Sequence, residues 1–388
     1  MKESFDVRPI LATDLPQLAE FLHRWRANRG EDVAHASIKF GIERRLRWLL
    51  QDNPFGSGTS HGYCVWDTSG AIRGADVAFP SPFIVNGTRL IGYCSGAFFV
   101  EPAARTLGTF LIKNYLSTGT FPFFFATTCN SQSGAIWKAL GGKAVPNHDR
   151  EYMFPFRLDV VLNTVLNGRS KALIRASLRC ARALNPLAQM LAKRSSGLRI
   201  RESCDWEKLS TLFYQNALPN VLTTDRTPRW LDWRYGERGP NAARIYTFCD
   251  KRGHEGWFVL GDVVRGYRAP LRGQILLDAV WPRHSMSFEN LFPAILRLAA
   301  SDGDALFLQP RAKVDYARCS RFIFSQRLPP RIFVVSRKAQ VPPISNFDFV
   351  PADGDSAFRI SGWPAALEQR ISSGSTTAAR QSESFAPM

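Results

Sequence analysis

The sequence predicts an α/β protein in which one unit of strands and helices occurs twice. An apolar run at 91–100 is followed by a turn, by apolar residues at helical spacing over 107–116, and by a second apolar run at 121–129. This is the order of a parallel strand–helix–strand unit. The same order of elements returns after residue 197, and 388 residues exceed what one core usually holds. We therefore expect two tandem domains, each with a mixed, mostly antiparallel sheet, a central parallel strand pair and flanking helices.

The first half opens with a short strand at 7–10 and a helix that Thr13 and Asp14 cap. A second helix over 37–51 stops before Pro54, because proline disfavours a helical conformation in the residue before it. The other expected elements are strands at 62–66, 71–79, 91–100 and 121–129, and helices at 107–116 and 130–140.

The segment between the halves is strongly basic, with no acidic residue between Asp159 and Glu202. It predicts an amphipathic helix that Pro186 kinks or interrupts. Three interpretations stay open: a linker helix with a solvated basic face, a helix at an anionic membrane surface, or a nucleic-acid contact. The basic face consists of Lys171, Arg175, Arg179 and Arg182, and the apolar face of Leu173, Cys180, Leu184, Leu187 and Leu191.

The second half repeats the pattern. Its sequence Val-Trp-Pro at 280–282 resembles Val-Glu-Pro at 100–102 in the first half. We expect an N-terminal domain at 1–157, a linker at 158–196, a C-terminal domain at 197–365 and a disordered tail at 366–388. Within the second domain we expect strands at 198–200, 245–249, 257–260, 273–282, 305–309 and 332–335, and helices at 206–213, 228–235, 288–300 and 314–323.

Lysine and arginine number 50 against 33 acidic residues, a net charge of +17, which predicts an acidic partner. The seven cysteines are scattered without a C-x-x-C pair, and the sequence contains neither a signal-peptide pattern nor an apolar run that spans a bilayer. We therefore expect a cytoplasmic protein, with peripheral contact to the inner membrane through the basic linker as the further option.

The turn after 91–100 is the first candidate site. The amides of a helix's first turn have no intrahelical partner and carry the positive end of the helix dipole. A turn that opens onto such a helix suits a phosphate group. The alternative is an ordinary strand–helix junction.

The residues in and after this turn resemble the GNAT superfamily of acyl-CoA-dependent N-acyltransferases. That family has a strand ending in V-x-P, a phosphate-binding turn of the type R-x-x-G-x-G/A, and an asparagine after the next strand. The resemblance covers about 5–155 and, more faintly, 197–336. The matching residues are Val100, Pro102, Arg105, Gly108, Asn130, Ile136, Trp137, Leu140 and Gly141.

The resemblance implies an enzyme that moves an acetyl or longer acyl group from CoA to an amine of a small molecule, a sugar or a bacterial cell-envelope precursor. Acetyl-CoA or acyl-CoA is the implied co-substrate, with pantetheine between 92–100 and 121–129. The residues implied to hold it are Phe99, Val100, Arg105, Thr106, Leu107, Gly108, Thr109, Phe110 and Asn130.

Several positions depart from the family pattern. Thr106 and Phe110 replace small residues, and Phe110 would either anchor the helix in the core or crowd the cofactor. Trp137 replaces the tyrosine that protonates the leaving thiolate, although an indole is no useful acid at neutral pH. No phosphate-binding turn follows Pro282, so the first half is the expected CoA-binding half, and the second half would line the acceptor site or serve structure.

An attacking amine must lose a proton, so a general base is expected. The weak catalytic candidates are Glu101, Asp76 and Trp137, with Asp278 in the equivalent strand of the second half. The six histidines show no ligand spacing, and we expect no metal. Two alternatives remain: an aminoacyl-tRNA-dependent transferase of the peptidoglycan cross-bridge type, and a non-catalytic binding protein of this fold at an anionic surface.

Overall fold

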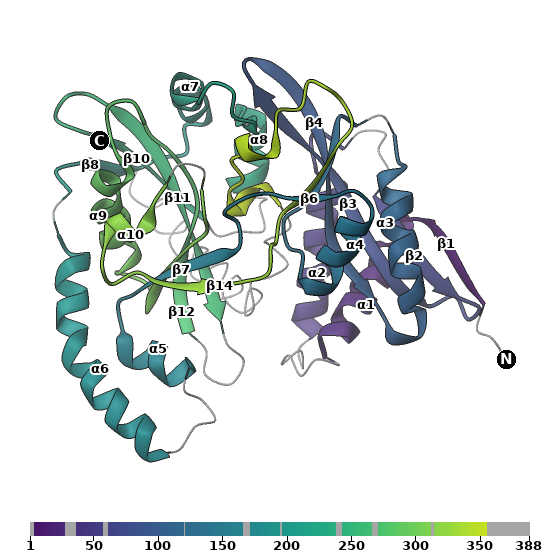
Figure 1. The fold of residues 1–388 in the computed structure, drawn as a ribbon, viewed down its shortest axis with the longest axis horizontal. Helices are drawn as coiled ribbons and strands as arrows, with labels where there is room; N and C mark the ends of the chain where they lie inside the picture. The colour runs from purple at the N-terminus through teal and green to yellow at the C-terminus, as the bar shows by residue number, and fades with distance from the viewer. Residues whose placement is uncertain are drawn as a thin grey trace, which may run out of the picture.

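Two mixed β-sheets lie side by side in the computed structural model, one in each half of the chain (Figure 1). This confirms the predicted fold class, whereas the tandem duplication stays a prediction. The residues that the structure describes are 4–27, 36–56, 61–119, 121–165, 171–194, 196–237, 243–265, 271–311 and 314–354.

The first sheet has eight strands in the order β1-β2-β3-β4-β5-β15-β6, with β9 paired to β3. Among the described pairs, β4 and β5 run parallel and the others are antiparallel. The strands are β1 (Phe5–Pro9), β2 (Gly62–Asp67), β3 (Ile72–Val85), β4 (Thr88–Val100), β5 (Phe123–Ala126), β6 (Lys143–Ala144), β9 (Thr223–Thr224) and β15 (Phe333–Ser336).

The second sheet has seven strands in the order β14-β7-β13-β12-β11-β10-β8. Its described parallel pair is β12 and β13, at the position that β4 and β5 hold in the first sheet. The strands are β7 (Arg150–Pro155), β8 (Arg199–Glu202), β10 (Ala243–Cys249), β11 (Glu255–Arg265), β12 (Leu271–Val280), β13 (Ala305–Leu308) and β14 (Phe324–Arg327).

The two sheets exchange strands. β7 comes from the first half of the chain but pairs with β13 in the second sheet. β15 comes from the end of the chain but pairs with β5 in the first sheet. Each parallel pair is thus covered on its outer edge by a strand from the other half, so the sheets do not follow the boundaries that we predict at 157 and 197.

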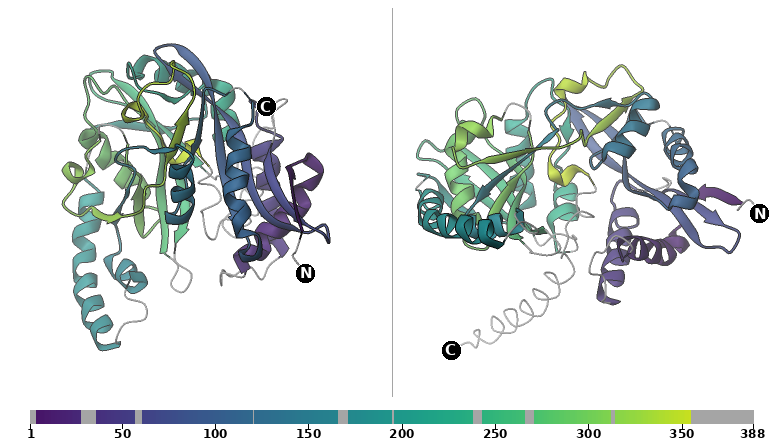
Figure 2. Two further views of the ribbon diagram at one scale, coloured as in Figure 1. Left: turned by 45° about the vertical axis from the view of Figure 1, so that its right-hand side comes forward. Right: turned by 60° about the horizontal axis from the view of Figure 1, so that its bottom comes forward.

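Helices cover both faces of each sheet. α1 and α2 lie on one face of the first sheet, and α3 and α4 on the opposite face (Figure 2). One continuous core joins α1, α2 and the first sheet to α7, α8 and the second sheet. The helices are α1 (Leu15–Ala27), α2 (Ala36–Leu50), α3 (Gly108–Leu116), α4 (Ser131–Ala139), α5 (Leu158–Val165), α6 (Lys171–Ala192), α7 (Trp206–Asn216), α8 (Pro228–Tyr235), α9 (Phe288–Ala299) and α10 (Tyr316–Cys319).

Several expected elements differ from the observed ones. The linker forms two helices, α5 and α6, and α6 continues through Pro186, so the predicted interruption is wrong. The strand expected at 121–129 is limited to β5, because the chain turns into the cap of α4. The helix expected at 314–323 is limited to α10, and β14 follows it. The predicted tail at 366–388 lies outside the described residues.

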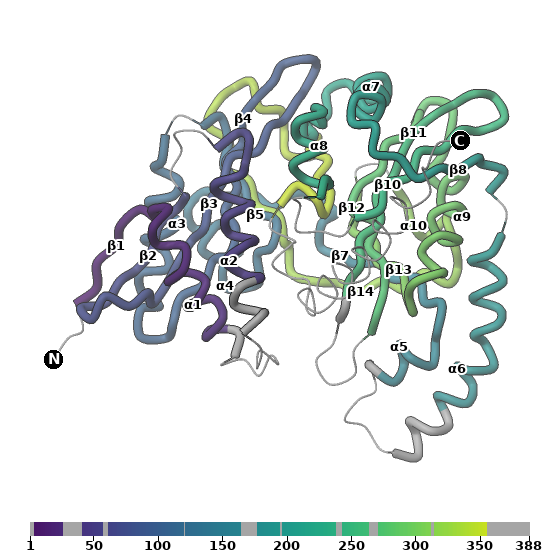
Figure 3. The backbone as a smooth tube through the Cα atoms, turned by 180° about the vertical axis from the view of Figure 1, so that it is seen from behind, coloured from purple at the N-terminus to yellow at the C-terminus, as the bar shows by residue number. Residues whose placement is uncertain are grey.

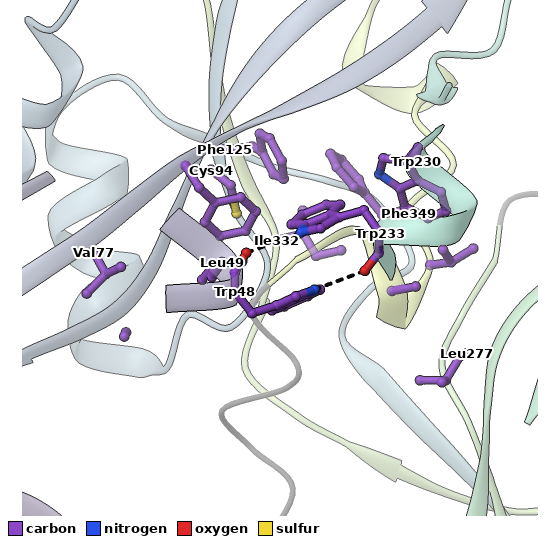
Figure 4. Close-up of a cluster of buried hydrophobic side chains, with 14 of the residues drawn as sticks. Trp48, Leu49, Val77, Cys94, Phe125, Trp230, Trp233, Leu277, Ile332 and Phe349 are labelled. Carbon is purple, nitrogen blue, oxygen red and sulfur yellow. Dashed lines mark hydrogen bonds between the residues drawn. The ribbon is translucent and has the colours of Figure 1, made fainter. Parts of the chain in front are cut away.

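The halves meet at Trp48 of α2 and Trp233 of α8 (Figure 4). Each indole N–H donates to the main-chain carbonyl of the other tryptophan, at 2.9 Å from Trp48 and 3.2 Å from Trp233. The rings stack with centroids 4.8 Å apart. Both donors are therefore satisfied inside the core, and the ends of the two helices are joined reciprocally.

Replacing Trp48 or Trp233 by alanine should lower the free energy of unfolding by about 3–5 kcal/mol each, because either change opens a large cavity. The double variant should lose less than the sum, since the two side chains contact each other. Urea denaturation measures all three losses. Trp206→Ala, at a partly buried tryptophan on α7, is the control and should cost less. Equal losses at the three positions would contradict the central role of the pair.

Candidate functional site

β4 separates from β5 in the middle of the first sheet. Their pairing covers 92–95 of β4 and 123–126 of β5. Beyond this, the register of β4 against β3 shifts between Ala75 and Val77, and Ala97 on β4 has a positive φ of 48°. β4 therefore carries one extra residue, a bulge that bends the strand away and redirects its main-chain groups. The gap lies where the sequence predicts pantetheine.

The segment after β4 is helical from its start. A 3₁₀ helix, η2 (Pro102–Leu107), continues directly into α3. The amide of Ala104 donates to the carbonyl of Glu101 at 3.0 Å, and that of Gly108 to the carbonyl of Arg105. These amides are engaged within the helical segment, and Pro102 has no N–H. The positive end of the segment therefore lies at 102–103 rather than at 105–110.

Side chains at the start of α3 separate into two groups. Gly108 is buried, and a Cβ atom there would lie 3.3 Å from the ring of Phe98, so the helix approaches β4 closely. Phe110 is 46% exposed and does not anchor the helix in the core. The other exposed residues here are Arg105, Thr106 and Thr109.

The last residues of β4 are partly buried. Phe99 contacts Trp25 of α1 with ring centroids 4.1 Å apart. Val100 and Leu107 pack together on the α3 side of the sheet. The structure therefore gathers the predicted cofactor residues from 99 to 110 around the end of β4, and their role in binding stays a prediction.

Asn130, the remaining predicted cofactor residue, caps α4. Its side-chain oxygen accepts from the amides of Gln132 and Ser133 at 2.9 Å each, and the Ser133 hydroxyl accepts from the Asn130 amide. This reciprocal capping fixes the start of α4 beside the gap. The Asn130 side chain therefore has a structural task of its own.

The three catalytic candidates do not converge. Glu101 is ion-paired with Arg73 at 3.1 Å and Arg24 at 3.6 Å. Asp76 is fully buried at the bulge, where Ser95 Oγ donates to it at 2.6 Å. Trp137 is 1% exposed. Of the three, Glu101 alone has appreciable exposure, and the catalytic roles stay predictions.

The second half repeats the separated strands but fills the gap. β12 pairs with β13 through Ile275, and its register against β11 then shifts between Val259 and Leu260. Arg311, just after β13, donates from Nη1 to the carbonyl of Ala279 on β12 at 2.5 Å. A protein side chain thus bridges the strands where the first half leaves them apart.

Asp278 lies in a buried ion cluster. Arg226, 1% exposed, donates to both of its carboxylate oxygens, at 2.7 and 3.2 Å. The Tyr235 hydroxyl donates to it at 3.3 Å. Asp353 lies 3.8 Å from Arg226 on the other side. Asp278 is thus neutralised by hydrogen-bonded arginine, which favours a structural role over that of a base.

The end of the described chain joins this cluster to the first half. Asp348 accepts from Arg311 at 3.1 Å and from Arg283 at 3.0 Å. Six residues later, the carbonyl of Gly354 accepts from Arg234, and a Cβ atom at Gly354 would clash with Thr127 at the end of β5. Sequence reasoning missed this segment, although two isolated aspartates in an otherwise apolar stretch signal buried partners.

A cavity of about 470 Å³ opens beside Arg311, between the two halves. Its walls come from 146–148, 219–221 and 345–347. His148 is buried here, and desolvation lowers its pKa to about 4, so the imidazole is neutral at pH 7. The sequence analysis did not single out this histidine, because its neighbours are distant in the chain.

No described helix is both long enough and apolar enough to cross a bilayer. No group of histidine, cysteine and carboxylate side chains in the described ranges has an arrangement that would hold a metal ion.

Comparison with known proteins identifies the fold. No protein-family model and no curated protein sequence matches the chain. Many solved structures share the fold. Among them is a probable N-acyltransferase from Enterococcus faecalis V583, with a TM-score of 0.51 and 12% identity over 87% of this chain and 74% of that one. A GCN5-related N-acetyltransferase from Anabaena variabilis ATCC 29413 matches with a TM-score of 0.51 and 12% identity over 85% of this chain and 72% of that one. Saccharomyces cerevisiae N-myristoyltransferase with bound myristoyl-CoA matches with a TM-score of 0.53 and 12% identity over 88% of this chain and 83% of that one. The chain has the fold of these acyltransferases, which confirms the predicted resemblance at the level of fold.

The raised pKa of Asp353 predicts that the free energy of unfolding depends on pH. Burial raises its pKa to about 6, against 3.8 for an ordinary aspartate. The folded state therefore binds this proton more tightly than the unfolded state, and the contribution of Asp353 to stability falls as pH rises from about 4 to about 6. Asp353→Asn should gain about 3 kcal/mol relative to the unmodified protein between pH 4 and pH 7.

Denaturant titrations across this pH range measure the difference. Asp52→Asn, at an exposed aspartate after α2, is the matched control and should follow the unmodified protein at every pH. A constant difference between Asp353→Asn and the unmodified protein would refute the assignment of the raised pKa.

Proposed function

We propose that the protein is an acyl-CoA-dependent N-acyltransferase and that its first half binds the acyl-CoA. The observation that carries this is the bulged end of β4, set apart from β5 and followed at once by the N-terminal end of a helix. The equivalent gap of the second half is bridged by Arg311. Solved structures that share the fold include a probable N-acyltransferase, a GCN5-related N-acetyltransferase and an N-myristoyltransferase with bound myristoyl-CoA.

Pantetheine would pair with main-chain groups of β4 beyond Ser95, where the pairing with β5 has ended. The pyrophosphate would lie against the start of η2, with Arg105 supplying a positive charge. A β4 amide at the bulge at Ala97 would donate to the thioester carbonyl and stabilise the oxyanion of the tetrahedral intermediate.

The reaction is a direct transfer. The amine nitrogen attacks the acyl carbonyl carbon, the C–S bond breaks, and CoA leaves as a thiol after taking up the proton that the amine loses. Glu101, at the end of β4, is the proposed proton acceptor because it keeps a partly exposed carboxylate there. The acceptor that we propose is a small molecule, sugar or cell-envelope precursor. Transfer from aminoacyl-tRNA remains the alternative, as does binding at an anionic surface without catalysis.

Gly108→Trp should abolish acyl-CoA binding, because a side chain at this position is driven into Phe98 beside the gap. Arg105→Ala should weaken binding about tenfold, the equivalent of roughly 1.4 kcal/mol for one charged contact. Calorimetric titration with acetyl-CoA and myristoyl-CoA measures both effects.

Arg297→Ala is the matched control, since Arg297 is an exposed arginine on α9, the helix after the second bulged strand. It should bind as the unmodified protein does. Absence of binding to either CoA ester by the unmodified protein, together with retention on tRNA, would replace the proposal with the aminoacyl-tRNA alternative.

We further propose that the protein is cytoplasmic and contacts the anionic inner-membrane surface through α6, which lies at the outer edge of the second half (Figures 1 and 3). Its inward face carries small side chains, and Ala181, Ala188 and Ala192 are buried there. Its outward face exposes Leu184 (46%), Leu187 (39%) and Met190 (61%).

Positive charge accompanies these exposed apolar side chains. Arg179 is exposed on the same helix, Lys193 and Arg194 are exposed directly after its end, and Arg182 lies 3.5 Å from Asp159. The side chains of Lys171 and Arg175, the other two predicted basic contacts, lie outside the described residues. Exposed apolar side chains flanked by lysine and arginine are the pattern of a helix that lies in the headgroup region of an anionic bilayer.

The double variant Leu187→Ser/Met190→Ser should reduce co-sedimentation with phosphatidylglycerol vesicles at least tenfold, because two apolar side chains worth about 1.5–3 kcal/mol each no longer enter the bilayer. Phe324→Ser removes an equally exposed apolar side chain on β14 and should not change binding. Equal binding of the double variant, or equal binding to vesicles of phosphatidylcholine alone, would overturn the membrane contact.

A further inference from the structure

The cavity beside Arg311 has unsatisfied polar groups in its wall. His148 is buried, with 7% of its surface exposed, and no hydrogen bond joins either ring nitrogen to a described residue. Nε of Arg311 is buried without a partner, although Nη1 and Nη2 of the same side chain are both engaged. A buried donor or acceptor left unpaired costs about 1–3 kcal/mol, so a ligand that supplies the missing partners is favoured.

The rest of the hydrogen-bonding wall carries no charge. Asn147, Asn220, Asn346 and Ser345 line it, and their amide and hydroxyl groups both donate and accept. The positive charge of Arg311 is already balanced by Asp348 at 3.1 Å and Asp278 at 3.8 Å. A phosphate or other multiply charged ligand would therefore lack an uncompensated partner here.

Apolar surface alternates with these groups. Pro146, Pro219, Val221 and Phe347 complete the wall. A hydrocarbon chain would offer no hydrogen-bond partner to His148 or to Nε of Arg311, which disfavours an acyl tail as the occupant. A ligand with C–H faces and many hydroxyl groups, each able to donate and accept, satisfies both kinds of surface.

We infer that this cavity is a carbohydrate-binding site. Its volume of about 470 Å³ is that of an ordinary small-molecule site. The neutral imidazole of His148 accepts from or donates to a sugar hydroxyl, and Nε of Arg311 donates to a second oxygen.

Saturation-transfer NMR of the full chain with glucosamine and with glucose tests the inference. Both sugars should give binding signals, because the site reads hydroxyl groups rather than the amine. His148→Ala should weaken both at least tenfold, and Val221→Trp, which fills the cavity, should abolish them. His254→Ala, at a histidine paired with Asp250 on the distant β10–β11 hairpin, is the matched control and should bind normally.

Thermal unfolding of each variant shows that it is folded, and ¹⁵N shifts of the His148 ring in the unmodified protein give a readout that does not depend on substitution. Those shifts should move when glucosamine is added. Binding of neither sugar, or signals unchanged by His148→Ala and Val221→Trp, would overturn the inference. The same samples are titrated with acetyl-CoA. Sugar binding without CoA binding would contradict the proposed transferase and support the sugar site. CoA binding without sugar binding would support the transferase and contradict the sugar site.

Discussion

The reciprocal hydrogen bonds between Trp48 and Trp233 fix the relation of the two halves. Each indole is both a ring in the shared core and a donor to the other half's backbone. Moving one half relative to the other would break two buried hydrogen bonds and a stacked pair at once. The strand exchange depends on this fixed relation, because β7 and β15 must each reach the edge of a sheet built mainly by the other half. Neither sheet is complete without the other half of the chain.

The two halves share an arrangement but differ in what fills it. Both have a parallel strand pair, a bulge on the first strand and a helix that follows, which supports the predicted duplication without proving descent. In the second half, Arg311 and Asp348 occupy the region of the separated strands, and Arg226 neutralises Asp278 beside it. At its own bulge, the first half has Ala97 and Phe98, neither of which carries a charge. The difference in side chains, rather than in backbone, makes the first half the better candidate for a cofactor.

Local patterns in the sequence were sufficient for the elements around β4 and α3, because alternation, helical spacing and Pro102 act within a few residues. They could not reveal which strand pairs with the outer edge of β5, because the sequence of an apolar strand such as β15 does not indicate its pairing partner. The sequence also could not show that 102–107 form a 3₁₀ helix. A turn and a 3₁₀ helix have similar compositions, and they differ in whether the amides donate hydrogen bonds within the segment. Phe110 illustrates a further limit. Its apolar side chain was compatible with a core anchor or with crowding of the cofactor, and the structure excludes the anchor because the side chain is exposed. His148 and Arg311 became neighbours only through the strand exchange.

The buried arginines of the second half hold the last described segment of the chain in place. A buried ion pair seldom stabilises a fold more than apolar packing would, because the desolvation of both charges offsets most of their attraction. Such pairs do fix register, and here they hold Asp348 and Asp353 at defined positions along one segment. That segment places Gly354 against Thr127, directly after β5, the strand from which β4 separates. The second half therefore need not bind a cofactor to act on the reaction. By holding this segment in register, it shapes one wall of the gap in the first half.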